Sequence, residues 1–175
     1  MFVNMNYKGI ELHEGNFIET VVCYFVRNDE VLLGLRKKVS AGLGENLYAG
    51  IGGKLEIGET YDKALLRETD EEICVEIVSY FFAAVIEFFY QDDPERNMRT
   101  IAYIVNDWKG IPQETESTKP EWFKQSDIPK INMFSDNKYW LPRILKSEKL
   151  YCQFVFNKYS GDDKKIVDMQ FNKLI

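Results

Sequence analysis

The stretch from Gly53 to Val75, GKLEIGETYDKALLRETDEEICV, constrains the fold of this chain more than any other part of its sequence. Residues 61–73 favour a helix, because they are rich in Ala, Leu, Arg and Glu and contain no proline. Thr60 is a suitable N-cap for that helix, and Gly58 can supply the positive φ of a preceding turn. The stretch therefore predicts a turn that leads directly into a helix.

Three glutamates share one face of this predicted helix, because Glu68, Glu71 and Glu72 are spaced three and four positions apart. A solvated acidic face is one interpretation, since like charges at that spacing cost only about 0.2–0.5 kcal/mol per pair when exposed. A metal site is the other, because a hard divalent cation such as Mg²⁺ holds clustered carboxylates ionised and bridges them to substrate phosphates. The Gly-Gly-Lys at positions 52–54 favours the metal site, since glycine lets the backbone approach a ligand and lysine adds positive charge.

Several residues of this stretch keep a fixed spacing: Gly53, Glu59, Arg67, Glu68, Glu71 and Glu72. The pattern of Gly, five residues, Glu, seven residues, Arg-Glu, two residues and Glu-Glu resembles the Nudix box of the Nudix hydrolases. Two positions depart from it: Thr69 stands where an aliphatic residue is usual, and Cys74 where the box usually has glycine. Neither is a ligand position. We expect the helix end at Cys74 either to need no positive φ or to tolerate some strain.

The resemblance implies a metal-dependent hydrolysis. The metal ligands that it implies are Glu68, Glu71, Glu72 and the Gly52 carbonyl, and the metal is Mg²⁺, with Mn²⁺ as an alternative. Water attacks a phosphorus of a nucleoside di- or triphosphate, which releases a nucleoside monophosphate and, from a triphosphate, pyrophosphate. Glu68 is the candidate for base or bridging ligand, Arg67 orients a box glutamate by a charge-assisted hydrogen bond, and Lys54 meets phosphate oxygens.

The similarity extends beyond the box, from about residue 20 to the C-terminus, and is greatest to the 8-oxo-dGTP diphosphatase branch. It rests on AGIGGK at 49–54, PEWF at 120–123, MFSDNKYWLP at 133–142 and the closing segment 151–168. In that branch an aromatic residue and a pair of acids hold the purine, and the matching substrate-binding positions are Phe134, Asp136 and Asn137. The amide of Asn137 replaces the second acid, and Ala49 replaces an asparagine that reads the base, so base choice is open.

Structural interpretations stand beside these binding roles. Phe134 can be core or lid packing, and Asp136 can simply cap the second helix. Arg36, in the loop before the box, either reaches substrate phosphates or is only solvated. A distal glutamate often contributes to the metal site of the family, but the aligned position is Ser117, beside Glu116, and we assign the role to neither.

The rest of the chain predicts strands around one or two helices. Strands are expected at 17–26, 31–35, 47–51, 75–90 (two strands or a bent one), 98–107, 121–123, 150–157 and 166–171, with a polar loop at 36–46. A second helix is expected from Ser135 or Asp136 to about Lys146, beginning late or kinking at Pro142. Periodicity alone indicates one α+β domain over residues 1–175. The resemblance implies the Nudix fold, an α/β/α sandwich with a central mixed sheet.

Composition limits the partners. The net charge is −6 and no basic stripe is present, which argues against a polymeric nucleic-acid partner but not against a single nucleotide. Three widely spaced cysteines predict free thiols that are buried or half-buried. The N-terminus lacks the pattern of a signal peptide and the apolar runs are too short to span a bilayer, so we expect a soluble, cytoplasmic chain without a membrane partner. Residues 1–16 form a leader of unknown role, and we assign no role to His13.

Three functions are compatible with these observations. The first is hydrolysis of a nucleoside triphosphate, including the removal of oxidised nucleotides such as 8-oxo-dGTP in support of DNA repair. The second is hydrolysis of another nucleoside-diphosphate derivative, such as a nucleotide sugar, ADP-ribose or a dinucleotide. The third is a Nudix-fold module that senses a nucleotide without cleaving it, against which the intact acids argue. The oligomeric state stays open.

Overall fold

A computed structural model describes residues 6–7, 10–37, 46–161 and 163–174. The strands are β1 (Asn6–Tyr7), β2 (Ile10–Glu11), β3 (Ile18–Arg27), β4 (Glu30–Arg36), β5 (Tyr48–Ala49), β6 (Glu76–Tyr90), β7 (Met98–Lys109), β8 (Thr118–Lys124), β9 (Lys149–Phe156) and β10 (Ile166–Leu174). The helices are α1 (Tyr61–Ile73) and α2 (Asn137–Ile144), with short 3₁₀ helices at Pro94–Arg96 (η2) and Gln125–Lys130 (η3). Positions 38–45 of the predicted loop lie outside the described residues.

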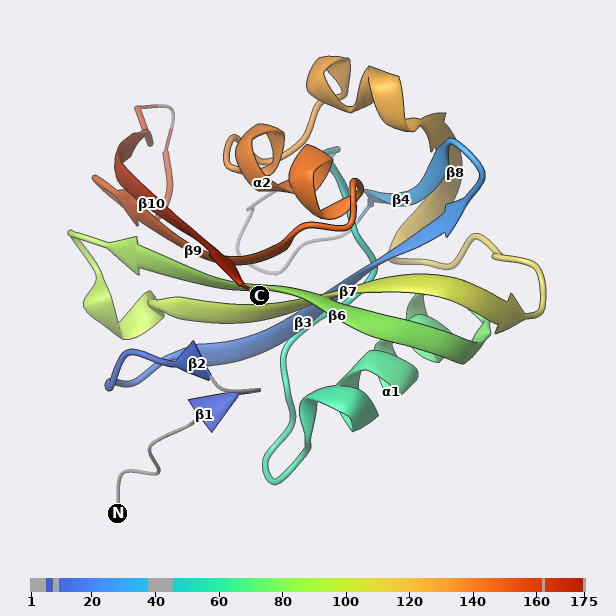
Figure 1. Cartoon of the computed structure of the whole chain (residues 1–175), viewed down its shortest axis with the longest axis horizontal. Helices are drawn as coiled ribbons and strands as arrows, with labels where there is room; N and C mark the ends of the chain where they lie inside the picture. Colours follow the sequence, from blue (N-terminus) through green and yellow to red (C-terminus); the bar gives the residue numbers. More distant parts are fainter. Residues whose placement is uncertain (1–5, 8–9, 38–45, 162, 175) are drawn as a thin grey trace.

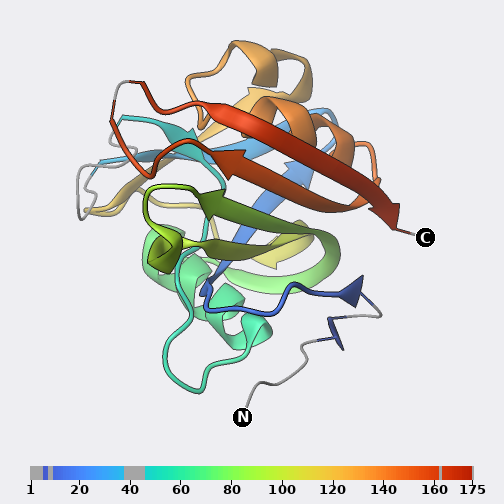
Figure 2. The ribbon, with the colours of Figure 1, turned by 90° about the vertical axis from the view of Figure 1, so that its left-hand side faces the viewer.

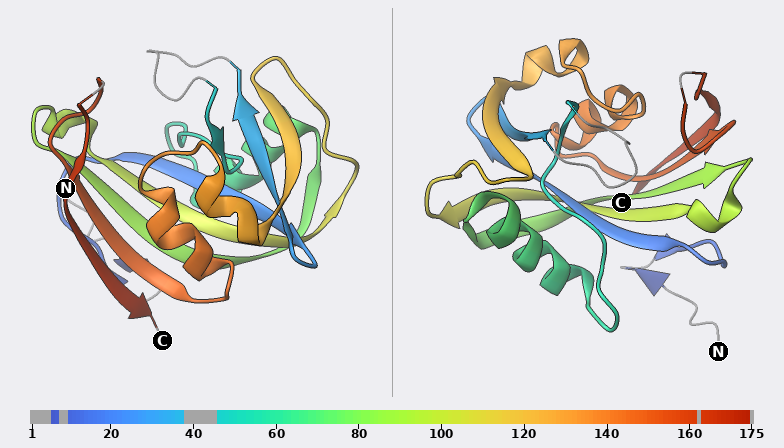
Figure 3. Two further views of the ribbon diagram at one scale, coloured as in Figure 1. Left: turned by 90° about the horizontal axis from the view of Figure 1, so that it is seen from above. Right: turned by 180° about the vertical axis from the view of Figure 1, so that it is seen from behind.

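A mixed sheet forms the centre of the molecule, with the strand order β10-β9-β6-β7-β3-β4-β5 and β8 paired to β4. The pairs β3–β7 and β6–β9 are parallel, and the other ladders of this sheet are antiparallel. Helix α1 lies on one face of the sheet, and α2 with η3 on the opposite face (Figures 1 and 3). The predicted α/β/α sandwich with a mixed sheet is confirmed.

Strands β3 and β4 separate soon after their turn, and this separation positions the glycines. Their register pairs Phe25–Arg27 with residues 30–32 only, after which β4 pairs with β5, while β8 pairs along the whole other edge of β4. The segment before the box enters the space between them: Cys23 bridges to Ile51, and the Gly53 carbonyl accepts a hydrogen bond from the backbone of β3 at 2.9 Å. The glycine-containing segment is thereby held as an extra strand against β3.

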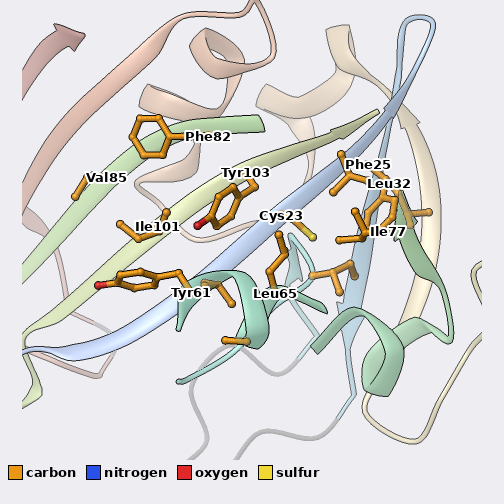
Figure 4. Close-up of a cluster of buried hydrophobic side chains, with 14 of the residues drawn as sticks. Cys23, Phe25, Leu32, Tyr61, Leu65, Ile77, Phe82, Val85, Ile101 and Tyr103 are labelled. Carbon is orange, nitrogen blue, oxygen red and sulfur yellow. The ribbon is translucent and has the colours of Figure 1, made fainter. Parts of the chain in front are cut away.

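Two hydrophobic clusters fill the sandwich, one on each face of the sheet. On the α1 side, Ala64, Leu65 and Ile73 of the helix are completely buried. Figure 4 shows Leu65 and Tyr61 of α1 facing sheet residues such as Cys23, Ile101 and Tyr103. Burial of a Leu or Ile side chain contributes about 1.5–3 kcal/mol. This packing fixes the rotation of α1 about its axis, so that Glu68 and Glu72 face the glycine segment and β8.

The two departures from the box pattern have local explanations. Thr69 is fully buried, and its hydroxyl donates to the carbonyl oxygens of Leu65 and Leu66 at 3.0 Å, so the polar group has partners within the helix. Cys74 has φ 57°, and its N–H donates to the Asp70 carbonyl oxygen. The helix end therefore does use positive φ, so of the two expected alternatives the one without positive φ is wrong and the one with a strained Cys74 is left. All three cysteines are free, and Cys74 is exposed rather than buried.

The structure decides two alternatives that the sequence left open, namely one strand or two at 75–90 and a late start or a kink in the second helix. Residues 76–90 form one strand whose register shifts at three places between Ile77 and Ala84, so the bent single strand is correct. Helix α2 begins at Asn137 and ends at Ile144 with Pro142 inside it, so the alternative of a late start is wrong. Among the described residues, no helix combines the length and apolar character needed to cross a membrane.

Part of the N-terminal leader belongs to the fold. Ile10 and Leu12 are buried in the α1-side cluster, and the leader lies on the same side of the sheet as α1 (Figures 1 and 2). The ring of His13 lies 2.8 Å from a carboxylate oxygen of Glu87 and 2.7 Å from the Tyr151 hydroxyl. His13, to which the sequence alone assigns no role, therefore has a structural one, because it attaches the leader to the sheet.

We predict that Cys74→Gly stabilises the protein by about 0.5–1 kcal/mol, because glycine adopts positive φ without the steric cost of a Cβ. Urea unfolding measures the change. Cys74→Ala keeps the Cβ and serves as the control, so it gains nothing. Equal stability of the glycine and alanine variants would show that the conformation at this position carries no strain.

Candidate active site

The guanidinium of Arg67 lies at the centre of the box. Its Nε and Nη2 donate to the two carboxylate oxygens of Glu59 at 2.9 and 2.8 Å, a forked pair of bonds. Its Nη1 donates to Glu68 at 2.8 Å and to Glu71 at 3.2 Å. Its Nη2 also donates to the Lys54 carbonyl oxygen at 3.0 Å. Arg67 thus contacts three of the box acids and the backbone before them, while its role of orienting a glutamate for catalysis stays a prediction.

Glu59 anchors the loop that precedes α1. Besides receiving the fork from Arg67, its carboxylate accepts the Glu56 N–H at 2.9 Å. The Arg67 hydrogen bonds lower the pKa of Glu59 to about 2, so this carboxylate stays ionised. Sequence reasoning matched Glu59 to the pattern without giving it a role. The structure shows that it fixes Arg67.

Glu68 packs directly against Gly53. A Cβ placed on Gly53 would lie 2.3–2.6 Å from the carboxylate atoms of Glu68, so a side chain at this position would displace that carboxylate. Burial raises the pKa of Glu68, and the adjacent Arg67 opposes that rise. The carboxylate is therefore held in one place by backbone on one side and by a guanidinium on the other.

Glu72 is the more deeply buried acid. It accepts the Gly52 N–H at 3.1 Å and the Thr118 hydroxyl at 3.2 Å. Burial raises its pKa to about 7, and the negative charge of Glu68 adds to the rise. Gly52 thus contributes its N–H to this carboxylate, while the metal-binding role expected of its carbonyl stays a prediction. Gly52 has φ 152°, and a Cβ there would lie 2.2 Å from the Val21 carbonyl oxygen.

The loop before β8 supplies hydroxyl groups to the same acid. Thr115 donates to the backbone carbonyl of Glu72 at 3.0 Å, while Thr118 donates to its side chain. Glu114 pairs with Lys37, and Glu116 is exposed. Nothing in the sequence marks Thr118, because β8 is brought beside α1 only by its long ladder with β4.

The residues present fit a hard divalent cation by their chemistry. Three carboxylates, those of Glu59, Glu68 and Glu71, are bonded to the single guanidinium of Arg67, and Glu72 lies buried near Glu68, so carboxylates outnumber the guanidinium. Across the described part of the chain, no three His, Cys, Asp or Glu side chains are gathered closely enough to hold a metal as they stand. Glu68 and Glu71 are both bonded to Arg67, and the Glu71 side chain is 59% exposed. A cation held by all three acids requires this side chain to rotate.

Two basic residues border the box. Lys54 is exposed, and its predicted contact with phosphate oxygens stays a prediction. Arg36, at the end of β4, lies with its guanidinium carbon 5.7 Å from the centre of the Phe134 ring, and its charge acts to lower the pKa of Glu72. Arg36 therefore connects the acidic helix with the predicted base-binding segment.

Strand β5 brings that segment to the site. The N–H of Tyr48 donates to the Asn132 carbonyl oxygen at 2.9 Å, and Tyr48 forms a bridge with Met133. Phe134, half-buried, follows directly. Residues 132–133 thus lie along the edge of β5 opposite β4, and Phe134 follows them beside Arg36.

Asp136 and Asn137 are buried and bonded to each other. The Asp136 carboxylate accepts from the Trp140 indole at 2.9 Å and from the Asn137 amide at 3.2 Å, and burial raises its pKa. The Asn137 amide oxygen accepts from the Tyr24 hydroxyl at 3.3 Å. Asp136 occupies the N-cap position of α2 but its side chain makes no capping hydrogen bond, so the capping interpretation is wrong.

Comparison with known proteins identifies this arrangement. The family model of the NUDIX domain matches residues 17–144. This chain belongs to the Nudix family. The Nudix chain is 32% identical over 126 residues to the oxidized purine nucleoside triphosphate hydrolase of Mus musculus, which covers 72% of this chain and 78% of the mouse protein. It is 30% identical over 138 residues to the protein of the same name from Danio rerio, with 79% and 84% covered.

A solved structure supports the fold in the same way. The crystal structure of the MutT protein from Bacillus halodurans superposes with a TM-score of 0.72 at 20% identity, covering 88% of this chain and 97% of that chain. The predicted Nudix fold is confirmed. With the family and its named relatives, the chain is a Nudix hydrolase.

We predict that the metal-free protein loses stability through Glu72 as pH rises. In the folded chain burial raises the pKa of Glu72 from 4.5 to about 7. The stabilising contribution of the neutral carboxyl is therefore complete below pH 4.5 and disappears as pH rises through 7. Between pH 5 and 8, wild type should lose roughly 2 kcal/mol relative to Glu72→Gln, which cannot ionise.

Urea unfolding of both proteins in a chelator, at several pH values, measures this difference. Glu71→Gln, at an exposed position of the same helix, controls for placing a glutamine on α1. Parallel stability curves for wild type and Glu72→Gln would contradict the prediction.

Proposed function

We propose that this Nudix hydrolase cleaves nucleoside triphosphates to nucleoside monophosphate and pyrophosphate with Mg²⁺, and that oxidised purine nucleotides are among its substrates. The observation that carries the proposal is the Arg67 network, which holds Glu68 beside a backbone glycine and leaves Glu72 buried next to it. The mouse and zebrafish relatives, whose names give oxidized purine nucleoside triphosphates as substrates, support the substrate class. The proposal takes residues 1–175 as a single Nudix domain, of which the family model matches 17–144.

The box side chains would hold the cation. Glu68, Glu71 and Glu72 are its proposed ligands, with the Gly52 carbonyl beside them. When bound, Mg²⁺ lowers the pKa of the attacking water and neutralises charge that develops on phosphate oxygens. Arg67 stays bonded to Glu59 and so keeps the neighbouring carboxylates in place after Glu71 has turned away.

Proton transfer is assigned to Glu68. Its half-buried carboxylate has a raised pKa, which makes it a stronger base than a solvated glutamate. It takes the proton of the attacking water while the water oxygen bonds to phosphorus and the bridging oxygen leaves with pyrophosphate. Lys54 and Arg36, on two sides of the box, supply positive charge to the phosphates.

The base is proposed to lie against Phe134, with Asp136 and Asn137 at its edge. Phe134 supplies a stacking surface. The Asn137 oxygen accepts from Tyr24 and one amide N–H donates to Asp136, which leaves the second N–H of Asn137 to act as donor. Ala49 has no hydrogen-bonding side chain, so we propose that discrimination between oxidised and normal purines is smaller than a buried polar reader would produce.

Pyrophosphate release across 8-oxo-dGTP, dGTP, other nucleoside triphosphates and ADP-ribose tests the proposal. We expect cleavage of the purine triphosphates, with 8-oxo-dGTP the faster. Glu68→Gln should lower kcat by about 10²–10⁴-fold, the usual contribution of acid–base catalysis. Asp70→Asn, at an exposed position of the same helix, is the matched control and should stay within about twofold of wild type.

Two results would count against the proposal in different ways. Cleavage of ADP-ribose in place of triphosphates would keep the box chemistry and refute the substrate class. Absence of cleavage of any nucleotide would refute the triphosphate hydrolysis itself.

A further inference from the structure

A buried cluster of charged side chains lies on the face of the sheet that α1 covers, apart from the box. Arg99, on β7, is 3% exposed and donates to the fully buried Glu87 at 2.9 Å and to Glu19 of β3 at 3.0 Å. Its third contact is the His13 carbonyl oxygen in the leader. Burying a charged pair is expensive, and such a pair often serves to fix geometry more than to add stability. We therefore asked which part of the structure this cluster holds in place.

Glu19 links this cluster to the catalytic helix. Its Oε1 accepts from Arg99, while its Oε2 accepts from the hydroxyl of Tyr61 at 2.6 Å. Tyr61 is the first residue of α1 and is 8% exposed. Figure 4 shows its ring between α1 and the sheet. The start of the helix is thus attached to β3 by one short hydrogen bond from a buried phenol.

Glu19 also holds the other end of the loop before α1. Its backbone carbonyl accepts the N–H of Leu55 at 3.0 Å. Residues 55–60 therefore run between two attachments to a single residue of β3. Between those attachments the loop projects outward, since the side chain of Ile57 is fully exposed and Gly58 turns with φ 79°.

This loop contains Glu59, the residue that fixes the Arg67 guanidinium. Glu59 lies within it and receives the forked bonds of Arg67, and Lys54, just before it, offers its carbonyl to the same guanidinium. The bonds that the loop makes to itself join Glu56 to Glu59 and do not fix its position on the protein. Its position therefore depends on the attachments at its two ends, together with the bonds from Arg67 to Glu59.

We propose that Glu19, held by Arg99, is a positioning residue for the Nudix box: it fixes both ends of the loop 55–60 and through Glu59 sets the place of Arg67. The inference rests on the proposed hydrolysis only for its effect on rate. A misplacement of catalytic groups by a fraction of an ångström lowers the rate of the chemical step more than the binding of substrate. The expected signature is thus a fall in kcat at nearly constant KM.

Charge neutralisation explains why Arg99 is needed. Burial raises the pKa of Glu19, and both the Tyr61 hydrogen bond and the charge of Arg99 oppose that rise. An ionised carboxylate is the stronger acceptor for a phenol hydroxyl. The leader contributes by supplying the His13 carbonyl oxygen to the third donor of Arg99.

Tyr61→Phe tests the proposal with the smallest change, because it removes one hydroxyl and keeps the buried ring. We expect kcat to fall about tenfold, with KM changed less than about twofold. Amide hydrogen exchange at Leu55 should become about tenfold faster, since one attachment of the loop is lost. Tyr80→Phe is the matched control: the Tyr80 hydroxyl donates to Asp62 in the first turn of α1 at an exposed site, and both readouts should stay within about twofold.

A second pair of variants separates positioning from folding. Glu19→Gln keeps an oxygen that can accept from Tyr61, whereas Glu19→Ala keeps none. We expect Glu19→Gln to restore most of the kcat that Glu19→Ala loses. A lower melting temperature with unchanged kcat and unchanged Leu55 exchange in Tyr61→Phe would overturn the proposal. If wild type cleaves no nucleotide the proposed function fails, while Leu55 exchange still decides whether Glu19 holds the loop.

Discussion

The forked hydrogen bonds between Arg67 and Glu59 are the contact on which the arrangement of the site depends. They join a helix residue to the loop before that helix, and the remaining donors of the guanidinium reach Glu68, Glu71 and the Lys54 carbonyl. Without the positive charge between them, the carboxylates would repel one another, and the Lys54 carbonyl would lose its donor. A lysine could not replace this group, because only a planar guanidinium presents five donors in fixed directions.

The fold makes this contact possible by separating two strands. Where β4 leaves β3, the segment 51–54 takes its place beside β3 and brings two glycines under α1. A side chain at Gly53 would occupy the position of the Glu68 carboxylate, and one at Gly52 would meet the backbone of β3. The acids are consequently close to backbone and partly buried, which raises the pKa of Glu72 and Glu68.

Local chemistry was enough to predict the helix and its acids, and tertiary contacts decided the rest. Helix α1 has the predicted bounds, and Thr60 caps it by accepting the Lys63 N–H, because cap, composition and face are set within a few residues. The contact of Thr118 with Glu72 could not be read from the sequence, since it depends on the pairing of β8 with β4. The same holds for His13, whose partners are far along the chain.

Isothermal titration with Mn²⁺ tests the central claim, that the acids around Arg67 form one cation site once Glu71 turns away from the guanidinium. Wild type should bind the ion, and Glu68→Gln, Glu71→Gln and Glu72→Gln should each weaken binding by at least about tenfold. Asp70→Asn, on the same helix, should leave it unchanged. Equal affinity in wild type and the three glutamine variants would contradict the account and leave the acids as a structural network around Arg67.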